Sequence, residues 1–171
     1  VWPEPASAEK ANPEGQLFLV HPDDRRDLEF GASGFLMTSR SVGAAGGGSG
    51  FAMIEVGSGW FLRPMVMGAR TVSTSPSGTL ASSHFDVCRR LPGNYSVRRG
   101  MQADLCAGSD LGFFAKDGGD TVAWATLGPS FGLRGELGSA LSVELRAMGA
   151  WLVPEPEVVA RLELGLTWRA R

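Results

Sequence analysis

Two groups of residues have the types that hydrolytic chemistry uses. Residues 128–132 read Gly-Pro-Ser-Phe-Gly and match the nucleophile elbow, in which a serine stands on a sharp turn between a strand and a helix. Here the flanking side chains keep alternating as in a strand, so we interpret Ser130 as a residue that fills an interior. The second group is His84 and Asp110, which could orient a general base if they lie opposite each other. His21 has no partner motif, and no spacing in the chain matches a metal site or another cofactor site.

The two cysteines of the chain fall at positions that a hairpin would pair. Folding the chain about Val97 brings Cys88 opposite Cys106 and, in the same register, His84 opposite Asp110. Both cysteines lie on the parity that carries the charges. Because two cysteines in a non-cytosolic protein suit one disulfide, we predict a Cys88–Cys106 bridge.

The elements that must position these residues are clearest in residues 141–168. Side chains alternate there between apolar and polar on both sides of a Pro-Glu-Pro turn at 154–156, which predicts two strands of about a dozen residues. A tilted membrane strand needs about 9–11 residues, whereas ordinary strands have about five or six. The apolar parity is expected to face lipid and includes Leu141, Val143, Leu145, Trp151, Leu162, Leu164, Leu166 and Trp168.

The opposite parity of this hairpin is charged. In the register that we favour, Arg146 lies opposite Glu163, and opposite charges across a strand pair are favourable. A register shifted by two residues would instead oppose Arg146 to Arg161 and Glu144 to Glu163. Like charges would then face each other, so we predict the first register.

Composition limits the classes of function. The chain has 171 residues, a net charge of -2 and 24 glycines, which indicates one domain and no affinity for nucleic acid. It has no run of 18 apolar residues, so a transmembrane helix is not expected. The sequence begins Val1-Trp2-Pro3 without a basic and apolar leader, and we expect a mature protein or a fragment.

The remaining strands follow from the same alternation. Residues 1–26 hold four prolines and are interpreted as an extended leader or linker, with a disordered terminus as the alternative. Residues 27–171 are assigned to a barrel, with Gly43–Gly50 expected to form a mobile loop and Phe113–Asp120 a polar loop. The first six strands are predicted at Asp27–Ser39, Gly50–Val56, Trp60–Val72, Ser82–Leu91, Val97–Gly112 and Thr121–Gly135.

Eight strands predict an all-β, antiparallel, up-and-down transmembrane β-barrel, which must close because lipid cannot satisfy an open edge. Trp60, Trp151 and Trp168 stand near strand ends, as an interfacial girdle requires, whereas Trp124 has inward parity without an explanation. The nearly balanced inward charges predict a salt-bridged plug rather than a selective channel. They are Glu29, Glu55, Arg63, Asp86, Asp104, Arg134, Glu144, Arg146, Arg161 and Glu163.

Residues 27–169 resemble the small eight-stranded outer-membrane barrels of the OmpA transmembrane domain and OmpX type. The resemblance rests on the strand pattern and on the closing segment from Ala160 to Trp168. It implies a structural disulfide-bonded protein of the Gram-negative cell envelope that serves as anchor, scaffold or adhesive surface. Its partners would be outer-membrane lipid and envelope proteins bound through the leader or the outer loops, and its termini would lie in the periplasm. In keeping with such barrels, the connections after the second, fourth and sixth strands are expected to be short and those after the first, third and fifth longer.

Two alternatives stay open. A soluble lipocalin-like or avidin-like barrel has the same period with its faces inverted and a ligand inside. Its interior would then hold leucines and tryptophans from every strand with little polar anchoring, which disfavours it. The resemblance also admits a lipid A acylase or deacylase, since some such barrels use His and Ser near the outer rim, where His84 and Asp110 are expected.

Overall fold

The computed structural model describes residues 28–72, 77–91, 101–153 and 157–170, and these form eight strands. No helix in the described ranges is long and apolar enough to cross a membrane, a finding that does not bear on strands. The strands are β1 (Leu28–Ser39), β2 (Gly43–Gly57), β3 (Trp60–Thr71), β4 (Gly78–Arg90), β5 (Met101–Lys116), β6 (Thr121–Glu136), β7 (Leu141–Leu152) and β8 (Glu157–Arg169).

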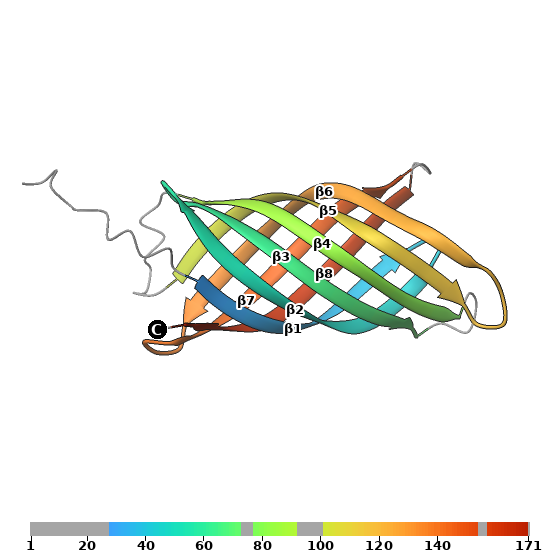
Figure 1. Ribbon diagram of the computed structural model, residues 1–171, viewed down its shortest axis with the longest axis horizontal. Helices are drawn as coiled ribbons and strands as arrows, with labels where there is room; N and C mark the ends of the chain where they lie inside the picture. Colours follow the sequence, from blue (N-terminus) through green and yellow to red (C-terminus); the bar gives the residue numbers. More distant parts are fainter. Residues whose placement is uncertain (1–27, 73–76, 92–100, 154–156, 171) are drawn as a thin grey trace, which may run out of the picture.

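The strands close into a barrel in which each strand pairs antiparallel with the next and β8 pairs with β1 (Figure 1). The predicted eight-stranded, antiparallel, up-and-down barrel is therefore confirmed. Leu28 begins β1 and Arg169 ends β8 at the same end, which we call the terminal end. The other end, where β1 turns into β2, is called the loop end.

Alternation of side chains determines the wall. In β1 every second residue from Glu29 to Ser39 is buried, and the residues between them are exposed. In β8 the buried residues include Arg161 and Glu163, whereas Leu162 and Leu164 are exposed. The wall thus carries charge inside and apolar side chains outside, the reverse of a water-soluble barrel.

The glycine-rich run at Gly43–Gly50, expected to be a loop, belongs to β2 and pairs with both β1 and β3. Glycine is a weak strand former, but two paired neighbours supply the backbone hydrogen bonds here. An inward Cβ at Gly47 would lie 2.1 Å from the carbonyl oxygen of Gly68, so the curved wall requires glycine there. The prediction of a mobile loop was wrong because a high glycine content was taken as a sign of mobility.

Three other boundaries differ from the prediction. β5 continues to Lys116, which places the first half of the predicted 113–120 loop in a strand, and β4 begins earlier, at Gly78. β5 begins at Met101, and Val97 lies outside the described residues.

The predicted sorting of connections into short and long sets is wrong. Residues 40–42 alone join β1 to β2 at the loop end, while residues 91–100 join β4 to β5 at the terminal end. Connection length therefore does not distinguish the loop end from the terminal end in the way that the sequence predicts.

Candidate functional site in the barrel lumen

The interior of the barrel holds a network of buried charges. Of the ten charged residues predicted to face inward, Glu55 lies at the terminal rim, partly exposed, with Arg90 at 3.3 Å. The other nine are buried, namely Glu29, Arg63, Asp86, Asp104, Arg134, Glu144, Arg146, Arg161 and Glu163.

Arg63 on β3 stands at the centre of this network. Its Nη2 donates to Glu163 Oε1 at 2.9 Å and lies 3.7 Å from Glu144 Oε1, and its Nη1 lies 3.5 Å from Asp86 Oδ2. The guanidinium also lies over the ring of Phe51, 4.1 Å from its centroid. One cation therefore joins carboxylates from β4, β7 and β8, which are far apart in the sequence.

Arg146 on β7 forms the second centre. It donates to Glu144 at 2.8 Å, to Asp104 at 2.7 Å and to the Ser130 hydroxyl at 3.1 Å. The predicted register, with Arg146 opposite Glu163, is confirmed, but no ion pair between these two side chains occurs among the described contacts. Long lumen side chains reach across the barrel, so strand register alone does not determine their partners.

His84 on β4 lies between two carboxylates. Its Nδ1 is 2.8 Å from Asp110 Oδ1, and its Nε2 is 2.9 Å from Asp86 Oδ2. Arg161 lies 3.2 Å from Asp110, and Thr126 donates to the other oxygen of Asp110 at 2.6 Å. The predicted pairing of His84 with Asp110 is confirmed, but the expected position near a rim is wrong, because both residues lie in the middle of their strands and are buried.

A smaller cluster of charged residues lies at the terminal end. Glu29 pairs with Arg134 and, at 3.2 Å, with Arg169 at the rim. Arg134 also donates to the Ser142 hydroxyl at 2.9 Å. This cluster joins β1, β6, β7 and β8 between the central network and the terminal rim.

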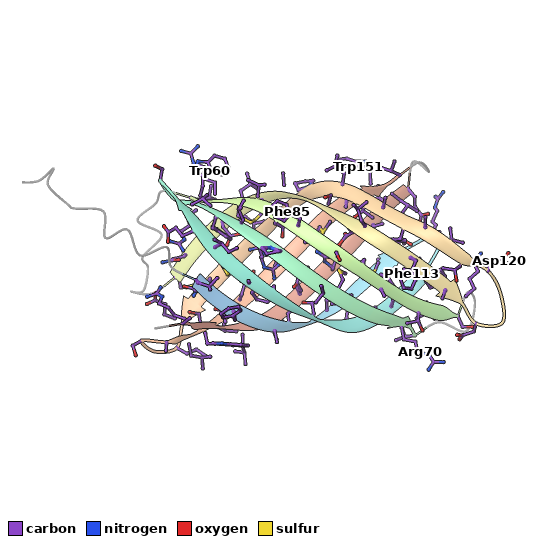
Figure 2. The ribbon with its side chains drawn as sticks, viewed as in Figure 1. Trp60, Arg70, Phe85, Phe113, Asp120 and Trp151 are labelled. Carbon is purple, nitrogen blue, oxygen red and sulfur yellow. A yellow bond between two sulfur atoms is a disulfide. The ribbon has the colours of Figure 1, made fainter. Side chains whose placement is uncertain are left out.

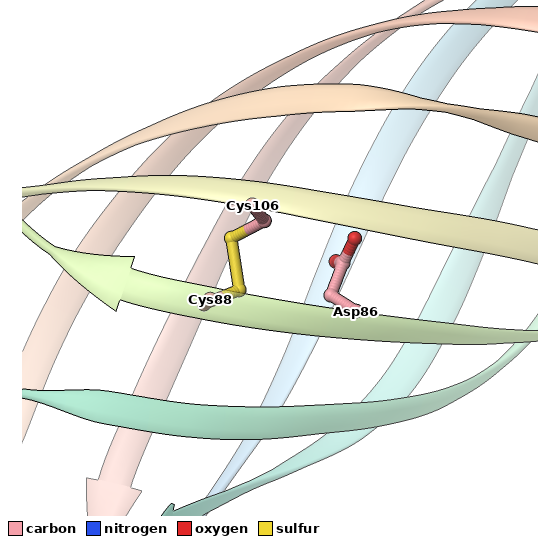
Figure 3. A group of neighbouring side chains, drawn as sticks. All are labelled: Asp86, Cys88 and Cys106. Atoms are coloured by element: carbon pink, nitrogen blue, oxygen red, sulfur yellow. A yellow bond between two sulfur atoms is a disulfide. The ribbon is translucent and has the colours of Figure 1, made fainter.

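Cys88 and Cys106 are joined by a disulfide across β4 and β5, in the register expected from the sequence (Figure 3). Asp86 is beside it, and its carboxylate and the two sulfurs lie within 4.8 Å of one another. Metal binding uses thiolates, which a disulfide does not offer. Arg146 Nη1 lies 2.8 Å from the sulfur of Cys106 and so ties the bridge to the ion network.

Glycines on the inner wall make room for the charged side chains. A Cβ at Gly108 would lie 2.1 Å from Asp86 Oδ1, and one at Gly132 would lie 2.7 Å from Asp104 and Arg146. Gly108 is the register partner of Asp86, and Gly132 is the register partner of Asp104 and Arg146, so these charged side chains need a neighbouring strand position without a side chain.

The loop end of the lumen is apolar, which the sequence reasoning missed. Trp124 packs there among other buried apolar residues, which explains its inward parity. Its signal was available, because the inward positions near that end of each strand change from charged to apolar. The residues include Met37, Val42, Met67, Leu80, Phe114, Trp124 and Val159.

The outer face carries the residues that were expected to face lipid. Val143 is partly exposed, and the other seven are exposed, namely Leu141, Leu145, Trp151, Leu162, Leu164, Leu166 and Trp168. In Figure 2, Trp60 lies at the terminal end, and Trp151 lies farther along the barrel, one residue before the end of β7. Trp168, next to the last residue of β8, shares the terminal end with Trp60.

No protein-family model and no curated protein matches the sequence. Among solved structures, the barrel is similar to Neisserial surface protein A, with 14% identity, a TM-score of 0.62, and coverage of 83% of this chain and 95% of that one. A major outer membrane protein from Thermus thermophilus gives 15% identity, a TM-score of 0.58 and coverage of 84% and 99%. The N-terminal barrel of Pseudomonas aeruginosa OprF gives 14%, 0.51, and 81% and 96%. The fold is that of the small outer-membrane barrels. At this identity, the eight-stranded barrel is shared as an architecture and not as a set of functional residues.

Proposed function

We propose that the chain is an integral protein of the Gram-negative outer membrane whose barrel serves as an anchor, scaffold or surface-interaction domain with a closed, ion-paired lumen. The observation that carries this proposal is the inverted polarity of the wall. Every strand places exposed apolar side chains on the outer face. The charged side chains that the structure describes in the middle of the strands are buried in the lumen.

The outer surface favours lipid over water. Monomeric soluble proteins rarely expose contiguous apolar patches of more than a few hundred Å². Here Leu162, Leu164 and Leu166 occupy successive outward positions of β8, and Leu145 on β7 is the register partner of Leu164. This arrangement argues against the soluble lipocalin-like alternative, whose exposed face would be polar.

Tryptophans support the same interpretation. Trp60 and Trp168 lie near the terminal end and Trp151 near the loop end, all of them exposed. Indole rings favour the boundary between hydrocarbon and head groups. The two levels of tryptophan match the two faces of a bilayer crossed by strands of 12 to 16 residues.

The geometry does not favour the acylase or deacylase alternative. The side chains of His84 and Asp110 are 0% and 4% exposed, so substrate does not reach them along the outer wall. Ser130 is also buried and accepts a hydrogen bond from Arg146 instead of facing a histidine. A non-enzymatic role is the better proposal.

Membrane insertion is tested by refolding the full chain into detergent micelles and comparing gel mobility before and after boiling. A compact band that unfolds only on boiling supports the proposal. A chain that stays folded and monodisperse in buffer without detergent overturns it in favour of a soluble barrel.

The closed lumen is tested by planar-bilayer recording of the refolded protein. Because Arg63, Arg146 and their carboxylates fill the centre, we expect no steady single-channel current. A stable conductance would show that the ion network lines a channel and does not block one.

We propose further that the termini face the periplasm and that residues 1–26 act as a leader that reaches envelope partners. An epitope inserted between residues 118 and 119, in the β5–β6 turn, should be accessible on intact cells. A C-terminal tag should become accessible only after the outer membrane is permeabilised. The opposite pattern would reverse the orientation and assign outer contacts to the terminal end.

A further inference from the structure

A groove of about 620 Å³ lies on the outer face of the barrel near the terminal end. It crosses the wall from β3 to β6 and runs from Trp60, the first residue of β3, to Pro129 in the middle of β6. Its lining includes Trp60, Val87, Arg89, Leu105, Ala107 and Pro129.

The strand register explains why the wall is hollowed here. Ala107 on β5 lies opposite Val87 on one side and Pro129 on the other, so two short side chains stand together. The next outward row toward the terminal end is bulky, because Leu105 lies opposite Phe131. The groove is therefore mostly apolar and built into the sheet, and toward the rim its lining continues to Arg89, the register partner of Leu105, and to Leu91.

Among the described residues that line the groove, Arg89 is the one that carries a charge. It points outward near the end of β4, and its guanidinium lies 5.5 Å from the ring centroid of Trp60, its register partner on β3. No carboxylate in the described part of the chain pairs with Arg89. The next residue, Arg90, differs because it faces the interior and pairs with Glu55.

We propose that this groove binds one anionic glycerophospholipid of the surrounding membrane, an inference that rests on the proposed membrane barrel. The lipid phosphate pairs with Arg89, the Trp60 indole packs at the level of the glycerol backbone, and one acyl chain lies over Ala107 and Pro129. Charge complementarity selects the head group, since an unpaired guanidinium at interfacial depth favours a phosphate that carries net negative charge. With the termini in the periplasm, the lipid belongs to the periplasmic leaflet.

The test uses the full refolded chain in zwitterionic micelles with equal amounts of phosphatidylglycerol and phosphatidylcholine of the same acyl composition. Native mass spectrometry gives the ratio of the two one-lipid complexes. Arg89→Gln should lower the preference for phosphatidylglycerol about fivefold, the effect of one arginine near a charged lipid. The matched control is Arg70→Gln, which removes an exposed outward arginine of β3 at the loop end and should leave the ratio unchanged.

A second variant tests the groove itself. Ala107→Leu fills the space between Val87 and Pro129 and should reduce the retained lipid of both kinds. An unchanged ratio in Arg89→Gln, an equal fall in Arg70→Gln, or full lipid retention in Ala107→Leu overturns the inference.

The heat-modifiable band is measured on the same samples and separates two kinds of failure. If the unaltered chain shows no heat-modifiable band, the proposed membrane barrel is wrong. If the band is normal but Arg89→Gln leaves the ratio of the two lipid complexes unchanged, only the proposed lipid site is wrong.

Discussion

Replacing Arg146 by methionine should destabilise the barrel strongly. The arginine is 1% exposed and pairs with Glu144 and Asp104 at 2.8 and 2.7 Å. Glu144 would keep Arg63 at 3.7 Å, whereas Asp104 would have no other cation in ion-pair range among the described residues. Breaking a buried ion pair by removing one partner costs about 3–5 kcal/mol. Since one of the two carboxylates keeps a partner, we expect a loss of about 3 kcal/mol in the free energy of unfolding.

The assay is reversible urea unfolding in micelles, with the fraction folded taken from the mobility of unboiled samples. Glu55→Gln is the matched control, because its pair with Arg90 at the rim is 28% and 31% exposed and should contribute at most about 1 kcal/mol. Adding Asp104→Asn to Arg146→Met should recover about 1 kcal/mol or more, since a neutral amide is less costly to bury than an unpaired carboxylate.

A loss of stability in Arg146→Met no larger than that in Glu55→Gln would contradict a stabilising buried ion pair. Water would then solvate Asp104 after the arginine is removed, and the lumen would be an open, hydrated space. Failure of the double variant to recover any stability would also contradict such an ion pair, because the loss would then come from packing and not from charge.

Two further perturbations use the same titration. Replacing Cys88 and Cys106 by serine should lower the free energy of unfolding by about 3 kcal/mol, since the bridge closes a loop of 18 residues in the unfolded chain; a change below about 0.5 kcal/mol would contradict this. Gly108→Ala should cost about 1–3 kcal/mol, because its Cβ would meet Asp86 Oδ1 at 2.1 Å, while Gly50→Ala, which meets nothing within 4 Å, should be neutral. Equal effects of the two alanine variants would show that Asp86 can move away from residue 108 without loss of stability.

The strand order, the faces and three cross-strand pairings could be predicted from the sequence. Lipid outside and charge inside impose a period of two, and that period also determines register once one turn is placed. For this reason Arg146 opposite Glu163 and Cys88 opposite Cys106 both followed from counting residues.

The contacts across the lumen could not be predicted in the same way. Arg63 reaches Glu144 and Glu163 through the interior, and such contacts depend on the tilt and stagger of the closed barrel. The prediction for the glycine run of β2 failed for a related reason, since the backbone of Gly68 comes close to Gly47 only when the wall is curved. A local sequence pattern shows the alternation of a strand, but it does not show which side chains meet when the strands close into a barrel.

Closure also governs how the chain can enter a membrane. Glu163 on β8 receives hydrogen bonds from Ser33 on β1 and from Arg63 on β3, and these partners meet only when β8 pairs with β1. A half-assembled sheet would hold the same charges unpaired against hydrocarbon, at a cost of many kcal/mol. Intermediates with an open seam are therefore much less stable in the bilayer than the closed barrel, and we expect neutralisation of these charges and sealing of the wall to occur together.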